Sequence, residues 1–252
     1  LIYSETIFAQ SASLKTIGTA NFSSMTNANK VFYKLTALEA IGVLHTPKIT
    51  TSVSMFEGCS KLISLPVFVT SNLTNASTMF AGCYKLVLDP GDYVFDSLVT
   101  GNRMFDSCSS MVKVTQIKCP KMTSGEKMFN ACTSIKTVGN VEFSACTNFS
   151  WGFYNCTSLE SVTTMYTPKL VSAWRIFEGC SNLVTVPIFD TTNVRICDNL
   201  FAGCSKLTID VGGFNLLKVQ NIDQMCYNCS SLTTVSGLNA PNATYAITNL
   251  FA

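Results

Sequence analysis

The chain has 252 residues, of which 47% are hydrophobic and only 13% are charged, and its formal net charge is +2. Because a typical soluble domain carries about 25% charged residues, most of the polar surface must consist of Ser, Thr and Asn. The near-neutral charge, without any basic run, argues against nucleic acid as a partner. No apolar stretch of the sequence reaches the roughly 18 residues of a membrane span.

A phenylalanine returns every 24 or 25 residues along the whole chain. The series consists of Phe8, Phe32, Phe56, Phe80, Phe105, Phe129, Phe153, Phe177, Phe201 and Phe251, and Cys226 stands where one phenylalanine is missing. A period this strict is typical of a solenoid, in which each repeat, or rung, buries its apolar face only against its neighbours. We therefore expect residues 1–252 to form one continuous stack of about ten rungs. Since both ends of the sequence fall inside a repeat, we also expect a fragment of a longer chain.

Within each repeat, short apolar runs predict β-structure. A leucine six residues after the phenylalanine and a β-branched residue three further on, as in the run 159–162, are too brief for a helix and predict a strand. Stacked once per rung, such runs form a parallel ladder with a spacing of about 4.8 Å. Pro66 and Pro187 mark the ends of two such runs. The return path, which contains a second apolar position such as Leu170, is either a second short strand or an irregular turn.

In addition to the repeat of 24 or 25 residues, the sequence has a longer period of 121 residues, which corresponds to five rungs. A shift by this amount places residues 56–60 on 177–181 and residues 80–83 on 201–204, and it places Asp89 on Asp210. We expect both aspartates to cap turns. The sequence therefore predicts two five-rung blocks, and an exposed patch on one block is expected to recur on the other.

The repeat also resembles a known family. The phrase Met55-Phe56-Glu57-Gly58-Cys59-Ser60-Lys61-Leu62, followed by Leu65-Pro66, is similar to one repeat of the BspA-like leucine-rich-repeat surface proteins, and the similarity covers the whole chain. The resemblance implies a mainly β, right-handed solenoid of the leucine-rich-repeat type. For many members it implies adhesion at a bacterial cell surface, and similar repeats also occur in phage-encoded proteins. No catalytic residue is carried over.

Cysteines follow the phenylalanines at a fixed distance of three residues. The expected core ladder consists of Phe56, Phe80, Phe105, Phe129, Phe153, Phe177 and Phe201 together with Cys59, Cys83, Cys108, Cys132, Cys156, Cys180, Cys204 and Cys229. Disulfides between adjacent rungs would need strained geometry, because the side chains run parallel. We favour buried free thiols that act as small hydrophobes. Cys226 and Cys229 form one close CxxC pair, which could indicate zinc or redox chemistry, but their register favours two core residues.

The candidate binding surface is the variable face between the two apolar strand positions. It comprises Lys15, Thr16, Glu39, Lys113, Lys136, Thr137, Glu160, Ser161, Thr185 and Thr234, with Tyr33, Tyr154 and Tyr227 as further candidates because aromatic residues anchor interfaces. For any one of these residues, a merely solvated position is an equal alternative. His45 is the one histidine in the sequence, and the carboxylates are scattered. We therefore predict no catalytic, cofactor or metal site.

Two functions follow as hypotheses. The first is a non-enzymatic, extracellular adhesion or receptor-binding solenoid, with a protein or glycan on a cell or matrix surface as its partner. The alternative is a structural spacer that associates with copies of itself in a virion fibre, a tail or a surface filament.

Overall fold

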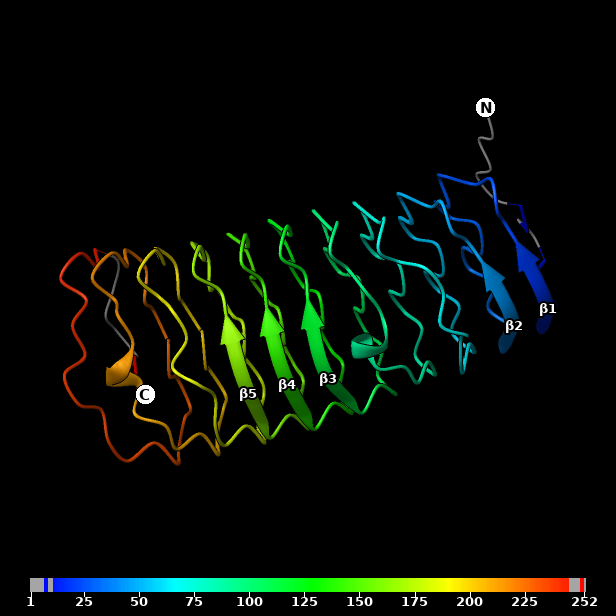
Figure 1. The fold of residues 1–252 in the computed structure, drawn as a ribbon. Coiled ribbons are helices and arrows are strands. Elements are labelled where there is room, and N and C mark those ends of the chain that lie inside the picture. The colour runs from blue at the N-terminus through cyan, green and yellow to red at the C-terminus, as the bar shows by residue number, and fades with distance from the viewer. Residues whose placement is uncertain (1–6, 9–10, 245–249, 252) are drawn as a thin grey trace.

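The computed structural model describes residues 7–8, 11–244 and 250–251, which form an elongated rod with β1 near one end and η2 near the other (Figure 1). The strands are β1 (Thr16–Asn21), β2 (Ala40–His45), β3 (Lys113–Lys118), β4 (Thr137–Glu142) and β5 (Ser161–Tyr166). Two short 3-10 helices, η1 (Pro90–Asp92) and η2 (Val211–Gly213), complete the regular elements of the described residues. The predicted mainly β solenoid with parallel strands is confirmed.

All strand pairs are parallel and in register with the repeat. In one sheet β1 pairs with β2, and Ile17 lies opposite Ile41. In the other sheet, β4 lies between β3 and β5, with Val138 opposite both Val114 and Val162. Outside these strands, successive rungs are connected by isolated parallel bridges, with one residue of each rung in the column. This column consists of Asn27, Thr51, Asn75, Thr100, Ser124, Asn148, Ser172, Ile196 and Asn221. The return path is therefore a column of single bridges, not a second strand.

The predicted position of the strand was wrong by several residues. The sequence placed it at 159–162, whereas β5 runs from Ser161 to Tyr166. The reason lies in the spacing of buried residues, which is three in this segment: Leu159, Val162 and Met165 are buried, and the residues between them face outward. A third buried position at Met165, beyond the two that the sequence analysis used, extends the strand toward its C-terminal end.

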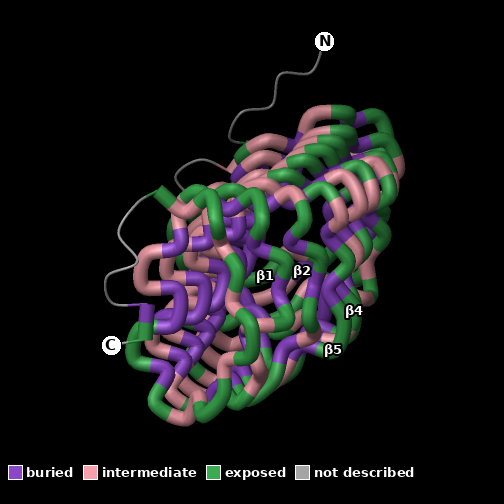
Figure 2. The backbone as a smooth tube through the Cα atoms, turned by 90° about the vertical axis from the view of Figure 1, so that its left-hand side faces the viewer, coloured by how far each residue is buried: buried purple, intermediate pink, exposed green. Residues whose placement is uncertain are grey.

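The core contains a continuous stack of phenylalanine rings. From Phe8 to Phe201, neighbouring rings in the series lie 5.0–5.6 Å apart between centroids, with interplanar angles of 5–14°. Near-parallel, offset stacking is a favoured arrangement of aromatic pairs. Viewed along the rod, buried residues gather inside the coil and exposed residues lie on its outer side (Figure 2). The predicted phenylalanine column is thus the central part of the core.

The backbone around each stacked phenylalanine has an unusual conformation. We call the segment from four residues before each stacked phenylalanine to two residues after it the phenylalanine edge. Around Phe129, both Lys127 (φ 57°) and Ala131 (φ 54°) adopt the left-handed region. Such angles are unfavourable for residues other than glycine, but both residues gain a hydrogen bond to the next rung. The amides of Lys127 and Ala131 donate to the carbonyls of Ser150 (2.9 Å) and Tyr154 (2.7 Å).

The two 3-10 helices lie 121 residues apart in the chain. In η1 the Asp89 carboxylate accepts a hydrogen bond from the Gly91 amide (3.0 Å), and in η2 Asp210 accepts one from Gly212 (2.8 Å). The predicted turn-capping role of both aspartates is confirmed. The division of the rod into two five-rung blocks stays a prediction.

Candidate functional site

The predicted strand-face residues lie in two neighbouring columns along the rod. Lys113, Thr137, Ser161 and Thr185 are parallel partners on successive rungs. In the adjoining column, the Glu160 amide donates to the Lys136 carbonyl and the Glu39 amide to the Lys15 carbonyl. Eight of the ten residues are exposed, whereas Glu39 and Ser161 are half-buried. The structure thus places these residues on one face, and their role in binding stays a prediction.

All twelve cysteines are buried and free. At the register of the core ladder, each thiol donates a hydrogen bond to the carbonyl of the phenylalanine one rung before it, at 3.0–3.2 Å. Burial raises the pKa of Cys59 and of Cys156 to about 12. These thiols are therefore packing residues that also satisfy a buried carbonyl, a role beyond that of the small hydrophobe expected from the sequence.

The CxxC pair lies at the C-terminal end of the ladder. Cys226 is buried at the position that phenylalanine occupies in the other rungs, and the Cys229 thiol donates a hydrogen bond to the Phe201 carbonyl at 3.1 Å. The hydrogen bond between the two thiols raises the pKa of Cys226 and lowers that of Cys229. Both residues occupy core positions, as their register predicts. Among the described residues, no group of three His, Cys, Asp or Glu side chains is arranged to hold a metal ion.

A polar hollow of about 370 Å³ opens on the phenylalanine edge of the N-terminal half of the rod. We call it the first hollow, and its lining consists of Lys34, Glu57, Gly58, Ala81, Gly82, Tyr84, Arg103, Asp106, Ser107 and Asn130. One wall contains the buried Asp106 carboxylate, which accepts hydrogen bonds from Arg103 Nε (2.8 Å), Ser107 Oγ (3.0 Å) and Asn130 Nδ2 (2.7 Å). The charge of this carboxylate is fully compensated within the wall.

A second hollow, of about 290 Å³, opens on the same edge of the C-terminal half. Its lining consists of Asn155, Glu178, Gly179, Asn199, Ala202, Gly203, Gln224, Tyr227 and Asn228. Asn199 Nδ2 donates to Gln224 Oε1 at 3.0 Å, and Arg175 forms an ion pair with Glu178 at 3.2 Å. Burial raises the pKa of the Glu178 carboxyl, and the Arg175 guanidinium opposes that shift. Amide side chains dominate this lining.

The two hollows occupy equivalent positions five rungs apart. A shift of 121 residues places Lys34, Glu57, Gly58, Ala81, Gly82, Arg103, Asp106 and Ser107 of the first on Asn155, Glu178, Gly179, Ala202, Gly203, Gln224, Tyr227 and Asn228 of the second. Both floors consist of two consecutive glycines of one column, in the left-handed region at φ 74–77°. Neighbouring rungs carry side chains in that column, so the missing side chains create the hollows.

An aromatic cluster lies on the same edge, on the rungs where the linings of the two hollows meet. The Trp151 and Trp174 rings are 4.1 Å apart between centroids, Lys127 Nζ lies 4.7 Å from the Trp151 ring, and the Arg175 guanidinium lies 5.3 Å from the Trp174 ring. Lys127, Trp151 and Arg175 stand in the column that also supplies Arg103 to the first hollow and Asn199 to the second. The two hollows and the cluster therefore form one continuous track along the edge.

Of the predicted tyrosines, only Tyr227 lines one of the paired hollows. Tyr33 and Tyr154 are half-buried and stand one rung before Glu57 and Glu178, next to Lys34 and Asn155, so they flank the hollows. The other lining residues were not predicted. The 121-residue period contained a signal for them, since both Glu-Gly pairs and both Ala-Gly pairs recur at that distance.

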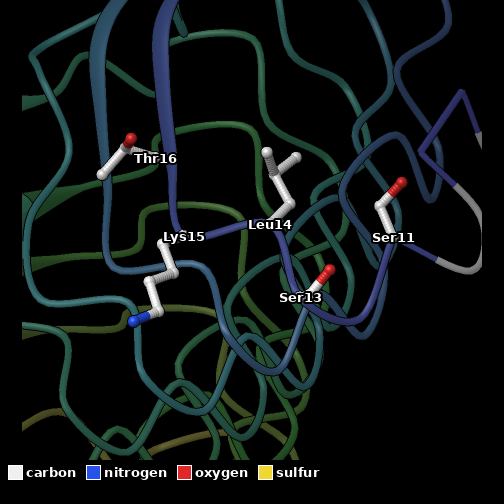
Figure 3. Close-up of a pocket in the computed structure, with 5 residues that line it drawn as sticks. All are labelled: Ser11, Ser13, Leu14, Lys15 and Thr16. Atoms are coloured by element: carbon white, nitrogen blue, oxygen red, sulfur yellow. The ribbon is translucent and has the colours of Figure 1, made fainter.

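Two further hollows contain strand-face residues, and both lie at the ends of the rod. A hollow lined by Ser11, Ser13, Leu14, Lys15 and Thr16 belongs to a single stretch of chain that leads into β1 (Figure 3). Thr234 lines a smaller hollow of about 180 Å³ beside Cys226 and Cys229. In the part of the chain that the structure describes, no helix has the length and apolar character to cross a membrane.

Comparison with known families gives one match over most of the chain. A family model described as "Mycoplasma protein of unknown function, DUF285" matches residues 4–118 and 121–239. No curated protein matches the sequence.

Three solved structures are similar to this rod in part. A leucine-rich-repeat protein of T. pallidum has 19% identity and a TM-score of 0.45, over 76% of this chain and 81% of its own. A leucine-rich cell surface protein of Faecalibacterium prausnitzii has 14% identity and a TM-score of 0.38, over 94% and 81%. A leucine-rich-repeat protein of Bacteroides ovatus has 17% identity and a TM-score of 0.28, over 85% and 77%. The fold assignment rests on the strands and columns described above, and the resemblance to the BspA-like family stays a prediction.

Proposed function

Because the chain belongs to the DUF285 family, whose function is unknown, we propose a function from its surface: a non-enzymatic, extracellular adhesion or receptor-binding solenoid. Its partners would be proteins or glycans on a host cell, on a matrix or on other cells. The observation that carries this proposal is the pair of polar hollows, at equivalent positions five rungs apart on one edge. A repeated concave surface on a rod can contact an extended or repeated partner at two points.

Each rung separates buried residues that stabilise the rod from variable residues at its surface, and this separation supports the proposal. The phenylalanine and cysteine columns are buried along the rod and stabilise it. Most residues that line the hollows and most residues of the strand face contact solvent, and they vary from rung to rung. In repeat proteins the extended surfaces left by such stacking are the usual binding surfaces.

The test is a binding measurement on the purified chain combined with size determination. Surface plasmon resonance against matrix proteins and a glycan array, together with binding to whole cells, should give saturable binding by a monomeric rod. The absence of binding to every surface, together with growth of polymers in multi-angle light scattering, would contradict the adhesion proposal.

A second candidate function, a spacer that packs side by side with copies of itself, is favoured by a set of exposed apolar residues. It consists of Val43, Ile63, Val67, Val69, Val87 and Val94, and Val67 is 66% exposed. Ile63 and Val87 lie on adjacent rungs, since the Val87 amide donates to the Ile63 carbonyl. Exposed apolar residues on neighbouring rungs are typical of contact surfaces. Replacing Val67 and Val87 by serine should abolish any concentration-dependent growth in size if this candidate is correct.

A further inference from the structure

We propose that the paired hollows each bind a segment of a neutral saccharide chain, and that one linear chain can occupy both hollows along the phenylalanine edge. The inference rests on the proposed binding function and names the chemical class of the partner. Four features carry it: the recurrence of the hollows, their charge balance, the chemistry of their walls and the track between them.

The charge balance of the hollows favours a neutral ligand. In the first hollow, the cations Lys34 and Arg103 match the anions Glu57 and Asp106 in number, and the Asp106 carboxylate is saturated by three donors. In the second hollow, the Glu178 carboxylate is ion-paired with Arg175. A charged ligand would bring a net charge into a balanced site, whereas hydroxyl groups add none.

The walls carry groups that suit hydroxyl groups as hydrogen-bonding partners. A sugar hydroxyl both donates and accepts hydrogen bonds, and an amide side chain offers both functions from one group. Asn155, Asn199, Gln224 and Asn228 supply four such amides to the second hollow. Each hollow also contains an exposed tyrosine, Tyr84 (50% exposed) in the first and Tyr227 in the second (37% exposed). An aromatic ring presents an apolar face together with a polar hydroxyl, which matches a sugar ring with its apolar face and polar rim.

The glycines at the floor of each hollow leave the backbone there accessible to a ligand, because they have no side chain. A side chain at Gly82 or Gly203 would stand in the same column as Ser107 and Asn228, which line the far ends of the two hollows. Asparagine is a suitable probe, because Asn155 and Asn228 adopt the left-handed region in this column at φ 56° and 59°. A Cβ atom at Gly82 or Gly203 would meet the preceding glycine at 3.6–3.7 Å, which is ordinary contact.

The spacing of the hollows favours a linear chain over two separate ligands. Five rungs at 4.7–4.9 Å correspond to about 24 Å along the rod. The linings of the two hollows meet on adjacent rungs, at Asn130 and Asn155, and the tryptophan cluster with its cations lies beside this junction. When one ligand engages two sites, the second contact is intramolecular and raises the apparent affinity by roughly 10² to 10⁴ if the linker can span them. We therefore expect long saccharides to bind far more tightly than short ones.

The experiment compares wild type with Gly82→Asn, Gly203→Asn and the double variant, each of which fills one or both hollows. Ala131→Asn is the matched control for the short probes, because Ala131 lies in the same column at φ 54° but lines neither hollow. The probes are neutral disaccharides and hexasaccharides of glucose, mannose and N-acetylglucosamine, and the corresponding polysaccharides. Isothermal titration calorimetry gives the stoichiometry for the short probes, and plasmon resonance gives the affinity for the polymers. Circular dichroism verifies that each variant is folded.

The expected result is two short saccharides per wild-type chain, one for each single variant and none for the double variant, with Ala131→Asn unchanged. Polymer affinity should fall at least about tenfold in each single variant, as the second contact is lost. If an asparagine variant does not fold, Tyr84→Ala and Tyr227→Ala replace it, because both side chains are exposed and line the hollows.

Two results would overturn the inference. Saccharide binding that survives in the double variant places the site elsewhere. Binding to cells or matrix proteins without binding to any neutral saccharide leaves the adhesion function standing and removes the saccharide assignment. If the wild-type chain binds neither saccharides nor any protein or cell, the proposed function itself fails.

Discussion

Replacing Phe129 by leucine tests whether the phenylalanine stack, and not apolar volume alone, stabilises the rod. Phe129 is fully buried between Phe105 and Phe153, at centroid distances of 5.3 and 5.2 Å and interplanar angles of 6° and 7°. Leucine keeps most of the apolar volume but removes both aromatic pairs. At about 0.5–1.5 kcal/mol per pair, Phe129→Leu should lower the free energy of unfolding by about 1–3 kcal/mol in addition to a small packing loss.

The assay is urea unfolding followed by circular dichroism, with the same exchange at Phe189 as the control. Phe189 is buried and pairs with Phe214 at 5.0 Å, outside the parallel stack. Phe189→Leu therefore loses one pair where Phe129→Leu loses two, and its cost should be smaller by about 0.5–1.5 kcal/mol. Equal costs for the two variants, or a cost below about 0.5 kcal/mol for Phe129→Leu, would refute the claim that stacking stabilises the column.

Two further predictions concern thiols and a strand glycine. At pH 8, iodoacetamide should label Cys59 and Cys156 slowly in the native protein, because burial raises their pKa to about 12 and keeps both thiols protonated. Mass spectrometry should find rapid labelling of these thiols only in denaturant. Rapid labelling of the folded chain would contradict their burial. Gly139→Ala should destabilise the protein by about 1–3 kcal/mol, since its Cβ would overlap the Thr115 carbonyl of the adjacent strand. Gly18→Ala is the control, because its Cβ would meet no atom within 4 Å; a similar shift of the thermal midpoint in both variants would argue against the strand packing described above.

The scaffold was predictable because it depends on residues that repeat. The phenylalanine and cysteine columns follow from spacing alone, since a solenoid must place equivalent residues above each other. The strand limits were harder to obtain, because the buried positions in 159–165 are three residues apart instead of two, which leaves the alternation typical of strands absent. The thiol hydrogen bonds could not be predicted, because they depend on whether a carbonyl such as that of Phe105 or Phe129 points toward the thiol of the next rung.

The candidate site was less accessible to sequence analysis. The exposed strand face could be derived from the pattern, but the paired hollows depend on backbone angles at residues such as Gly82 and Gly203. A glycine in a repeat is ambiguous in the sequence, because it can mark a turn, a bulge or close packing. The sequence shows glycine at the same register on two consecutive rungs, but only the structure shows that these positions lie at the floor of a hollow. The 121-residue period predicted that a patch would recur, without indicating which one.

The direction of the hydrogen bonds on the phenylalanine edge gives this edge an electrical polarity. Around Phe129, the amides of Lys127, Phe129 and Ala131 all donate toward the next rung in the chain, and the same holds on every rung from Phe32 to Phe201. Aligned peptide dipoles add, as they do in an α-helix, so this edge carries partial positive charge toward its C-terminal side and partial negative charge toward its N-terminal side. Both hollows lie in the same field and in the same orientation. A linear ligand with a dipole along its length would therefore favour the same direction in both hollows.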